Sequence, residues 1–362
     1  MTATLTAESP ARAARTNRIP VAVLGATGSV GQRFVQLLEH HPWFRLHEVV
    51  ASERSAGKTY ADAADWRLDT ILPESAAPLK VKALGEELES RLVFSGLDSS
   101  VAGEAEDDYA NRGCAVITNA KNHRMDADVP LLLPEINADH VAAIQKQRAR
   151  RRGYIVTNSN CSTMGLALAI APIEIRWGIE QLHTTTMQAV SGAGYNGVSS
   201  LAILDNVIPY INGEEEKIES EPQKILGKWD GNRFIPSPMR ISAHTNRVPT
   251  IDGHLMTISL RIRDRDFDLG AIREALESFT GEPQRLGLPS APKRPIHYID
   301  APDRPQTRLD RDRENGMSVS VGRLRPCPLL DIRMVALVHN TIRGAAGAAL
   351  LNAELLDAKG LL

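Results

Sequence analysis

The first half of the chain alternates short apolar runs with segments of helical periodicity. Residues 19–24 form an apolar, β-type run, a glycine-rich turn occupies 25–31, and apolar positions then recur at helical spacing. A second β-type run at 46–51 completes a strand-helix-strand unit. Later runs and helical segments continue this alternation at 92–94, 115–117, 138–148 and 155–156. The pattern predicts an α/β fold whose N-terminal part is a doubly wound parallel sheet, a Rossmann domain.

The pattern changes after residue 158, where longer β-rich runs lie at 182–190 and 255–262 with a charged loop between them. We expect a second, α+β domain there, built on a largely antiparallel sheet that a strand at 331–337 closes. An Ala- and Leu-rich helix at 343–358 is expected to pack back on the first domain. The predicted units are a disordered tail (1–18), the Rossmann domain (19–158, completed by a C-terminal helix within 341–362) and the second domain (159–340).

Composition excludes several classes of partner. The 362 residues carry 42 Lys and Arg against 44 Asp and Glu, so the net charge of -2 does not favour binding to nucleic acid or to an anionic membrane. We find no run of transmembrane length, no signal-peptide pattern and no metal-ligand spacing. Three cysteines are too few for a disulfide framework. These features predict a cytoplasmic protein that acts on a small molecule.

The glycine turn after the first strand has the properties of a dinucleotide site. Gly25 permits a tight turn, Gly28 lets backbone N–H groups approach a pyrophosphate, and Gly31 lets the helix pack closely on the strand. The spacing is GxxGxxG, and its place inside a strand-helix-strand unit favours a cofactor site over a purely structural turn. The predicted cofactor contacts here are Gly25, Thr27, Gly28, Ser29, Val30 and Gly31.

The residues after the second strand bear on the choice between NAD and NADP. Glu53 would hold the ribose hydroxyl of NAD, whereas Arg54 with Ser52 and Ser55 would hold the 2′-phosphate of NADP. Two hydroxyls and a guanidinium favour NADP as the cofactor, while Glu53 keeps NAD open.

Cys161 is the strongest candidate for a nucleophile. It lies in an Asn-Cys-Ser-Thr turn at 160–163, between a β-branched apolar run and an apolar helical run. A thiol in the first turn of a helix meets unpaired N–H groups and the positive end of the helix dipole, which lower its pKa. A buried structural cysteine is the alternative, but the polar neighbours of Cys161 favour covalent catalysis.

Three further polar residues lie near the ends of β-rich runs. Gln188 precedes a glycine turn, where its amide can orient a substrate carbonyl. Arg247 and His254 are seven residues apart, and the breaks between them let both side chains turn into one pocket. An Arg fork binds a carboxylate, and a His is the natural acid-base partner of a nucleophilic Cys. The charge run at 214–217 is typical of a solvated face.

The chain resembles the aspartate-semialdehyde dehydrogenases, most of all the branch found in archaea, fungi and some bacteria. The similar segments follow the family's order at 25–31, 159–163, 188–194, 214–217, Arg247 with His254, and 339–347. The resemblance covers nearly the whole chain from residue 19. It implies that the second domain serves catalysis and dimerisation, in a homodimer or homotetramer.

The same resemblance implies roles for individual residues. Cys161 would be the acylated nucleophile, His254 the acid-base group and Gln188 the residue that orients the acyl group. Arg247 would clamp the substrate α-carboxylate, and Glu214 would contact its amino group. The remaining implied contacts are Lys217 and Arg124 for phosphate, Asn160 for the substrate, and Ser191, Gly192 and Asn340 for the cofactor.

The implied reaction is the NADPH-dependent reductive dephosphorylation of L-4-aspartyl phosphate to L-aspartate 4-semialdehyde, which serves lysine, threonine and methionine biosynthesis. Backbone N–H groups at 160–162 would stabilise the oxyanion. A malonyl-CoA reductase of the same fold and a noncatalytic dinucleotide-binding regulator are the alternatives; Asn160, Glu214 and Lys217 favour the amino-acid substrate. The Pro-Gly-Cys turn expected of an N-acetyl-glutamyl-phosphate reductase is absent. Glu53 departs from the smaller or uncharged residue expected in relatives.

Overall fold

The computed structural model describes residues 17–362, so the tail predicted for 1–18 lies almost entirely outside the described residues. Its N-terminal part is a parallel sheet with strand order β3-β2-β1-β4-β5-β6, which confirms the predicted doubly wound fold. The strands are β1 (Ile19–Leu24), β2 (Phe44–Ala51), β3 (Val81–Ala83), β4 (Leu92–Ser95), β5 (Ala115–Thr118) and β6 (Tyr154–Thr157). The strand order reverses between β1 and β4, and open α/β sheets bind ligands at such a point.

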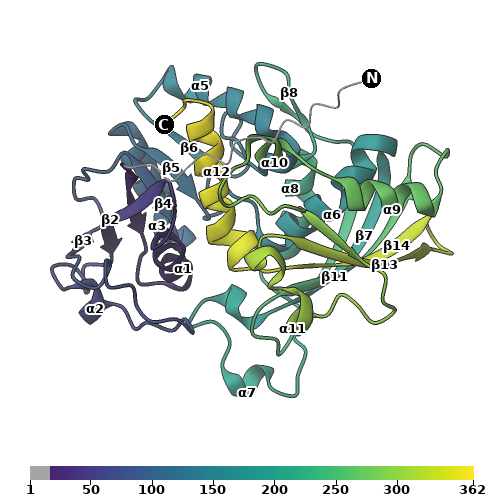
Figure 1. The fold of residues 1–362 in the computed structure, drawn as a ribbon, viewed down its shortest axis with the longest axis horizontal. Coiled ribbons are helices and arrows are strands. Elements are labelled where there is room, and N and C mark those ends of the chain that lie inside the picture. The colour runs from purple at the N-terminus through teal and green to yellow at the C-terminus, as the bar shows by residue number, and fades with distance from the viewer. Residues whose placement is uncertain (1–16) are drawn as a thin grey trace, which may run out of the picture.

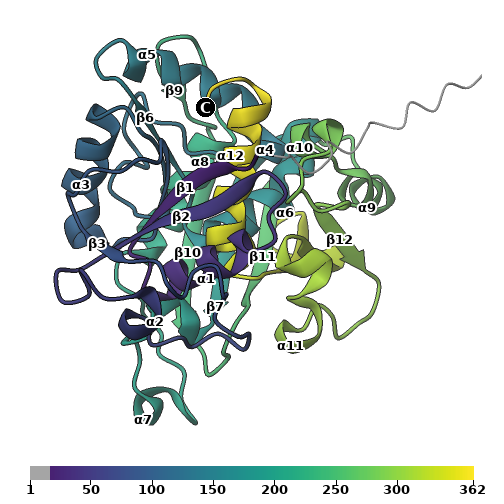
Figure 2. The same ribbon diagram turned by 60° about the vertical axis from the view of Figure 1, so that its left-hand side comes forward.

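Helices cover both faces of this sheet because alternate strand residues point to opposite sides. Val21 and Val23 belong to one apolar cluster, whereas Ala22 and Leu24 belong to another that contains Tyr109 of α3. Figure 2 shows the first sheet between these helical layers. The helices of this part are α1 (Ser29–Leu38), α2 (Tyr60–Ala63), α3 (Ser99–Asn111), α4 (Pro134–Asn137), the 3-10 helix η1 (Ala138–Ala143) and α5 (Ile144–Arg148).

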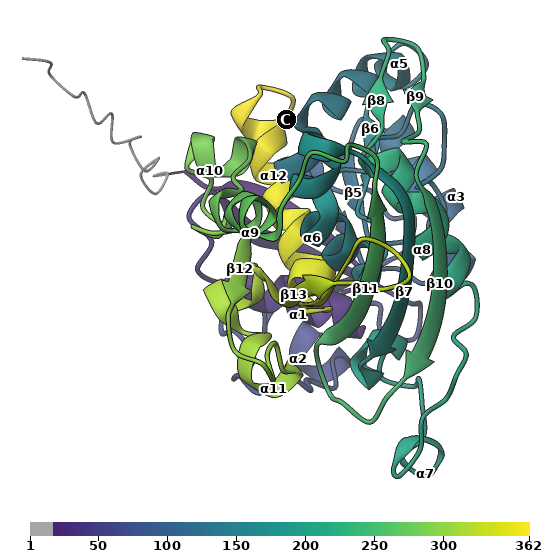
Figure 3. The same cartoon turned by 90° about the vertical axis from the view of Figure 1, so that its right-hand side faces the viewer.

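A second six-stranded sheet has the order β10-β7-β11-β14-β13-β12. Its central pairings are antiparallel and its two outermost pairings are parallel, in agreement with a largely antiparallel sheet. Figure 3 looks onto this sheet. Its strands are β7 (Ile179–Gln188), β10 (Arg240–Arg247), β11 (His254–Ile262), β12 (Ile296–Ile299), β13 (Val319–Pro326) and β14 (Ile332–Val338), and a separate hairpin contains β8 (Lys228–Trp229) and β9 (Phe234–Ile235).

One face of the second sheet packs against apolar helices. Met164, Leu168 and Ile173 of α6 share a fully buried cluster with Met256 and Ile258 of β11. The helices after β6 are α6 (Cys161–Trp177), the 3-10 helix η2 (Val190–Ala193), α7 (Ser200–Ile203), α8 (Glu214–Ile225), α9 (Leu269–Ser278), α10 (Glu282–Leu286), α11 (Thr307–Asp310), the 3-10 segment η3 (Arg313–Gly316), the π-helical turn η4 (Ile342–Ala346) and α12 (Gly347–Ala358).

The C-terminal helix α12 lies between the two sheets (Figure 1). Leu350 and Leu351 belong to the same buried cluster as Val21 and Phe34 of the first sheet and its helix α1. The turn η4 leads directly from β14 into α12. The last helix therefore packs on the first sheet and is joined through η4 to β14 of the second sheet.

Three expectations need correction. The strand expected to close the second sheet is β14, which lies inside it between β11 and β13 because both of its edges are hydrogen-bonded. The charged segment between the β-rich runs is not a loop but contains α8, whose first turn holds three glutamates. The helix expected at 138–148 begins as the 3-10 helix η1.

Candidate active site

A cavity of about 800 Å³ opens above the glycine turn, at the carboxyl ends of β1 and β4. Gly25 has φ +70°, and a Cβ there would lie 2.8 Å from the carbonyl oxygen of Gly96. A Cβ at Gly31 would lie 2.1 Å from the carbonyl oxygen of Gly25, so only glycine allows α1 to start this close to the turn. Gly28 caps α1 and leaves the helix N-terminus open to the cavity. This cradle fits a dinucleotide pyrophosphate.

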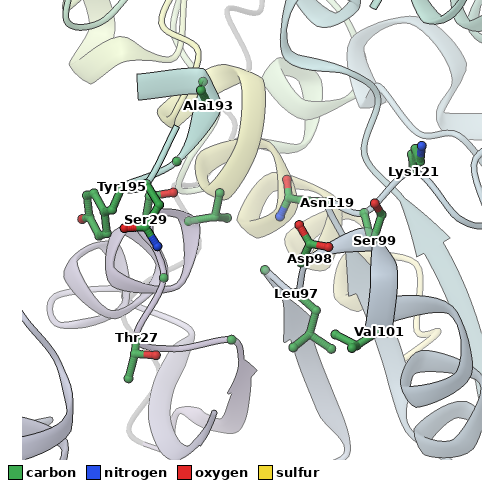
Figure 4. Close-up of a pocket in the computed structure, with 18 of the residues that line it drawn as sticks. Thr27, Ser29, Leu97, Asp98, Ser99, Val101, Asn119, Lys121, Ala193 and Tyr195 are labelled. Carbon is green, nitrogen blue, oxygen red and sulfur yellow. The ribbon is translucent and has the colours of Figure 1, made fainter. Parts of the chain in front are cut away.

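The cavity wall contains most of the predicted cofactor residues and several that the sequence did not indicate. Figure 4 shows Thr27 and Ser29 on one side, with Leu97, Asp98 and Asn119 opposite them. The predicted residues in the wall are Gly25, Thr27, Gly28, Ser29, Val30, Ser52 and Gly192; the additional polar ones include Asp98, Ser99, Asn119, Lys121 and Tyr195. Arg54 and Ser55 are not in the wall but in the turn that follows Ser52.

The thiol of Cys161 lies at the first residue of α6, facing an imidazole. Its Sγ is 3.2 Å from Nε2 of His254, the first residue of β11. The side chain of Asn160 caps the helix by accepting hydrogen bonds from the N–H groups of Ser162 and Thr163. The predicted strand-turn-helix placement of the thiol therefore agrees with the fold.

The backbone fixes the orientation of the His254 ring. Its Nδ1 lies 3.0 Å from the backbone nitrogen of Ala189 and accepts that N–H. The neutral ring must then carry its proton on Nε2, toward the sulfur of Cys161. His254 is fully buried, and burial, together with Arg247, lowers its pKa to about 3. His254 therefore faces the thiol as a neutral N–H donor.

The expectation of a lowered pKa for Cys161 is wrong for the ligand-free chain. Burial, followed by the charge of Glu214, raises the pKa of this thiol to about 12. The pKa of Cys161 is lowered by the positive charges of Arg124 and Arg247 and by the N–H of Ser162, but by less than burial and Glu214 raise it. The helix terminus contributes as predicted, whereas desolvation and a carboxylate distant in sequence outweigh it.

These pKa values predict the order in which iodoacetamide labels the cysteines. In the ligand-free protein, we expect Cys327 to react before Cys161 near neutral pH. Burial raises the pKa of Cys327, but the N–H groups of Leu330 and Leu329, the Ser259 side chain and the charge of Arg333 together lower it below the ordinary value. Labelling of Cys161 should keep rising by roughly tenfold per pH unit, without a plateau near neutral pH. Mass spectrometry of the labelled peptides measures both rates. A neutral-pH plateau at Cys161 would indicate a thiolate-imidazolium pair instead.

Arg247 and Gln188 meet because β10 and β7 run side by side. Residue 247 pairs with residue 188 in the parallel register, so both side chains come from neighbouring strand ends. Arg247 is buried, and its Nη1 donates to the carbonyl oxygen of Ala189 at 2.7 Å. His254 begins the strand on the other side of β7. Arg247 ends β10 and His254 begins β11, so the predicted break between them is present and both side chains reach one pocket.

A second cavity of about 400 Å³ contains these groups and continues from the first. Cys161, Gln188, Glu214, Arg247 and Asn340 line it. The residues that line both cavities are Ser29, Val30, Asn119, Arg124, Asn160, Gly192 and Ala193. A cofactor above the glycine turn would therefore lie beside the thiol.

Glu214 and Lys217 of the charge run at 214–217 line this site, whereas Glu216 is exposed, so only part of the run is a solvated face. Glu214 is buried; its Oε2 accepts from Nδ2 of Asn160 at 2.8 Å and its Oε1 accepts from Nζ of Lys217 at 2.6 Å. Burial raises the pKa of Glu214, but Lys217, Asn160 and Gln188 outweigh it and keep the pKa below the ordinary value. Glu214 is therefore an ionised group that already has a cationic neighbour before any ligand binds.

Two family models match the chain. A semialdehyde dehydrogenase NAD-binding domain matches residues 20–144, and a semialdehyde dehydrogenase dimerisation domain matches residues 170–343. The aspartate-semialdehyde dehydrogenase of Candida albicans is 49% identical, with 94% of this chain and 98% of the relative covered. The chain belongs to the aspartate-semialdehyde dehydrogenase family. The enzyme of Methanothermobacter thermautotrophicus is 47% identical, with 94% of this chain and 99% of the relative covered.

Solved structures of aspartate-semialdehyde dehydrogenases have the same fold. The crystal structure of the Candida albicans protein with NADP superimposes with a TM-score of 0.89 at 46% identity, covering 96% of this chain and all of that one. Aspartate-semialdehyde dehydrogenase II of Vibrio cholerae gives a TM-score of 0.75 at 27% identity, with 94% and 99% covered. The predicted resemblance is therefore confirmed.

In this member of the aspartate-semialdehyde dehydrogenase family, the turn η4 forms the wall opposite the thiol. A Cβ at Gly344 would lie 2.7 Å from the Cβ of Cys161, so only glycine permits this approach. Asn340 precedes the turn; its Nδ2 donates to Oγ of Ser191 and its Oδ1 accepts the N–H of Gly253, both at 2.8 Å. The role of Gly344 was not predicted, because its contact with Cys161 is distant in sequence.

Two features are absent from residues 17–362. In residues 17–362, no cluster of three or more His, Cys, Asp or Glu side chains is arranged to hold a metal ion. No helix in the described part of the chain is long and apolar enough to cross a membrane.

Proposed function

We propose that the protein catalyses the reversible, NADPH-dependent reductive dephosphorylation of L-4-aspartyl phosphate to L-aspartate 4-semialdehyde. The observation that carries this proposal is the Cys161–His254 pair at 3.2 Å, in a cavity that shares walls with the nucleotide cradle. Relatives at 47–49% identity are named for this activity.

The side chains around the thiol suit each group of the substrate. Arg247 can form a fork to the α-carboxylate, and the ionised Glu214 can hold the α-ammonium group. Arg124 and Lys217 line the larger cavity, where their positive charges suit the phosphate. The amide of Gln188, buried beside Arg247, is placed to orient the acyl group. Asn160 and Glu214 distinguish an amino-acid substrate from malonyl-CoA, which has no ammonium group.

In the first step, the sulfur of Cys161 attacks the acyl carbon: a C–S bond forms, the C–O bond to phosphate breaks, and the thiol proton leaves with the phosphate as hydrogen phosphate. The two cationic side chains near that oxygen stabilise the leaving phosphate. NADPH, when bound, supplies the hydride that reduces the thioester. The Nε2–H of His254 hydrogen-bonds to the carbonyl oxygen as it becomes an alkoxide. When the C=O bond re-forms, the C–S bond breaks, the aldehyde is released and the sulfur of Cys161 takes up a proton from solvent. Splitting the reaction at a thioester replaces one difficult step by two easier ones.

The donors for the oxyanion differ from the predicted set. Of the three backbone N–H groups at 160–162, the N–H of Asn160 donates to Glu221 and that of Ser162 donates to the side chain of Asn160. The N–H of Cys161 is the one left for a ligand in the described chain. We infer that it acts together with Nε2–H of His254 as the oxyanion site.

The assay that tests the proposed function is the reduction of NADP by L-aspartate 4-semialdehyde in the presence of phosphate. We expect rapid reduction that stops when phosphate is omitted, and no useful reduction of malonyl-CoA by NADPH. Activity on malonyl-CoA with none on the semialdehyde would replace the proposal by the malonyl-CoA reductase alternative. NADP binding without either activity would favour the noncatalytic regulator.

We propose NADP as the cofactor, with Arg54 and the serines Ser52 and Ser55 at its 2′-phosphate. Arg54→Ala is expected to weaken NADP binding by about 1–3 kcal/mol and to leave NAD binding nearly unchanged, because only NADP carries that phosphate. Fluorescence titration of both nucleotides measures the effect. Tighter binding of NAD than NADP by the parent protein would instead assign the ribose contact to Glu53.

We also infer a homodimer or homotetramer in the cytoplasm. The residues at 170–343 match a dimerisation domain, and one face of the second sheet is left exposed at His183, His244 and Arg333. The three cysteines are free, which suits a reducing compartment. Light scattering after gel filtration distinguishes a monomer from either assembly.

A further inference from the structure

Helix α8 presents a row of charged side chains to the candidate site. Glu214, Lys217, Glu221 and Lys224 are spaced by three, four and three residues, which places them on one face of the helix. Glu214, Glu221 and Lys224 are buried. The first two residues of the row belong to the substrate site described above, whereas the function of Glu221 is unassigned.

Glu221 joins two parts of the site that come from different segments of the chain. Its Oε1 is 2.8 Å from Nη1 of Arg124, and its Oε2 accepts the backbone N–H of Asn160 at 2.6 Å. The carboxylate is 2% exposed and lines neither cavity, so it does not contact a ligand directly. One buried carboxylate therefore holds both the guanidinium of Arg124 and the residue that caps the nucleophile's helix.

Additional contacts complete the positioning of Arg124. Its Nη2 donates to the carbonyl oxygen of Asn119 at 2.7 Å, and Nζ of Lys224 donates to the carbonyl oxygen of Arg124 at 2.7 Å. The buried Nε–H of Arg124 has no partner in the described chain, although this side chain lines both cavities. The guanidinium is thus held by one hydrogen bond at each of Nη1 and Nη2, which leaves other N–H groups of its five, the Nε–H among them, without a partner in the described chain.

We propose that Glu221 is a positioning residue that fixes Arg124 relative to Cys161, so that the phosphate and the attacking sulfur are both held within reach of the acyl carbon. This inference rests on the proposed function, because it assigns phosphate to Arg124. A carboxylate that holds the guanidinium at one end and the turn before the thiol at the other keeps the leaving group and the nucleophile in one geometry. A small displacement of the reacting groups can lower the rate by about a hundredfold.

The test compares Glu221→Gln with Glu216→Gln, a control at an exposed glutamate on the same helix. In the assay with semialdehyde, NADP and phosphate, Glu221→Gln is expected to raise the KM for phosphate by roughly ten- to hundredfold and to lower kcat by at least about tenfold. The KM for NADP should stay within about twofold of the parent value, and Glu216→Gln should change neither constant. A purely structural role would lower the melting temperature and the active fraction without raising the KM for phosphate.

A double-mutant cycle with Arg124→Gln decides whether Glu221 acts through Arg124. In the Arg124→Gln background, Glu221→Gln should no longer raise the KM for phosphate, but should still lower kcat because the contact to Asn160 is also altered. The double variant removes both charges of the buried Glu221–Arg124 pair together, so it keeps the test valid if Glu221→Gln alone does not fold. Equal effects of Glu221→Gln on the phosphate KM with and without Arg124, or none in either case, would overturn the inference. Inactivity of the parent protein would instead reject the proposed function.

Discussion

Replacement of Cys161 by Ala is expected to abolish turnover, by at least about 10⁴-fold in kcat, while the fold and NADP binding stay intact. The side chain of Asn160 and not the thiol caps α6, and the nucleotide cradle does not include Cys161. Cys161→Ser should retain at most a trace, because a hydroxyl ionises much less readily than a thiol. Steady-state kinetics and NADP titration on the same preparations measure both effects.

The other cysteines provide the control. Cys114 is buried away from the site, and Cys327 lies at the far end of β13, so Cys327→Ala should leave kcat unchanged. Full activity of Cys161→Ala would contradict the covalent mechanism, whereas loss of NADP binding in that variant would indicate a damaged fold.

Arg247→Lys is expected to lower kcat/KM by about 10²–10³-fold, although it keeps the positive charge. A lysine cannot hold the carbonyl of Ala189 and also offer a two-pronged fork to the α-carboxylate, as the guanidinium can. Arg240→Lys is a matched control, because Arg240 lies on the same strand, is exposed and has only a long contact to Glu180. Arg240→Lys should change kcat/KM little, because surface ion pairs contribute roughly 0–1 kcal/mol.

Comparable kinetics for the two lysine variants would show that Arg247 does not contact the substrate. A rise in the KM for the semialdehyde with unchanged kcat would show that Arg247 binds ground state and transition state equally. The account predicts losses in both constants, because a misplaced carboxylate also misplaces the reacting carbon.

The sequence predicted those parts of the site that depend on local structure. The glycine turn and the position of Cys161 at a strand-to-helix turn follow from residues that are contiguous in the chain. The alternation of strands and helices likewise predicted the parallel sheet. The family motifs then brought Gln188, Arg247 and His254 into one site, and all three line or adjoin the thiol cavity.

Contacts between distant segments could not be predicted in the same way. Helix α8 has few apolar positions, so its charges suggested a solvated loop; their partners Asn160 and Arg124 lie in other segments. The pKa of Cys161 was mispredicted for the same reason, because burial and Glu214 are tertiary features that outweigh the local helix terminus. The four-residue strand β12 and the eight-residue strand β13, which ends in Gly-Arg-Leu-Arg-Pro, gave too weak an apolar pattern to identify.

The most direct test of the account is a rapid-mixing experiment with the semialdehyde and NADP in the absence of phosphate. We expect a burst of about one NADPH per subunit, as in covalent catalysis with a slow second step, and a peptide containing Cys161 that carries one aspartyl acyl group. Addition of phosphate should then discharge this group and restore turnover. A chain that reduces NADP without a burst, or whose Cys161 stays unmodified while the burst occurs, would contradict a thioester at Cys161.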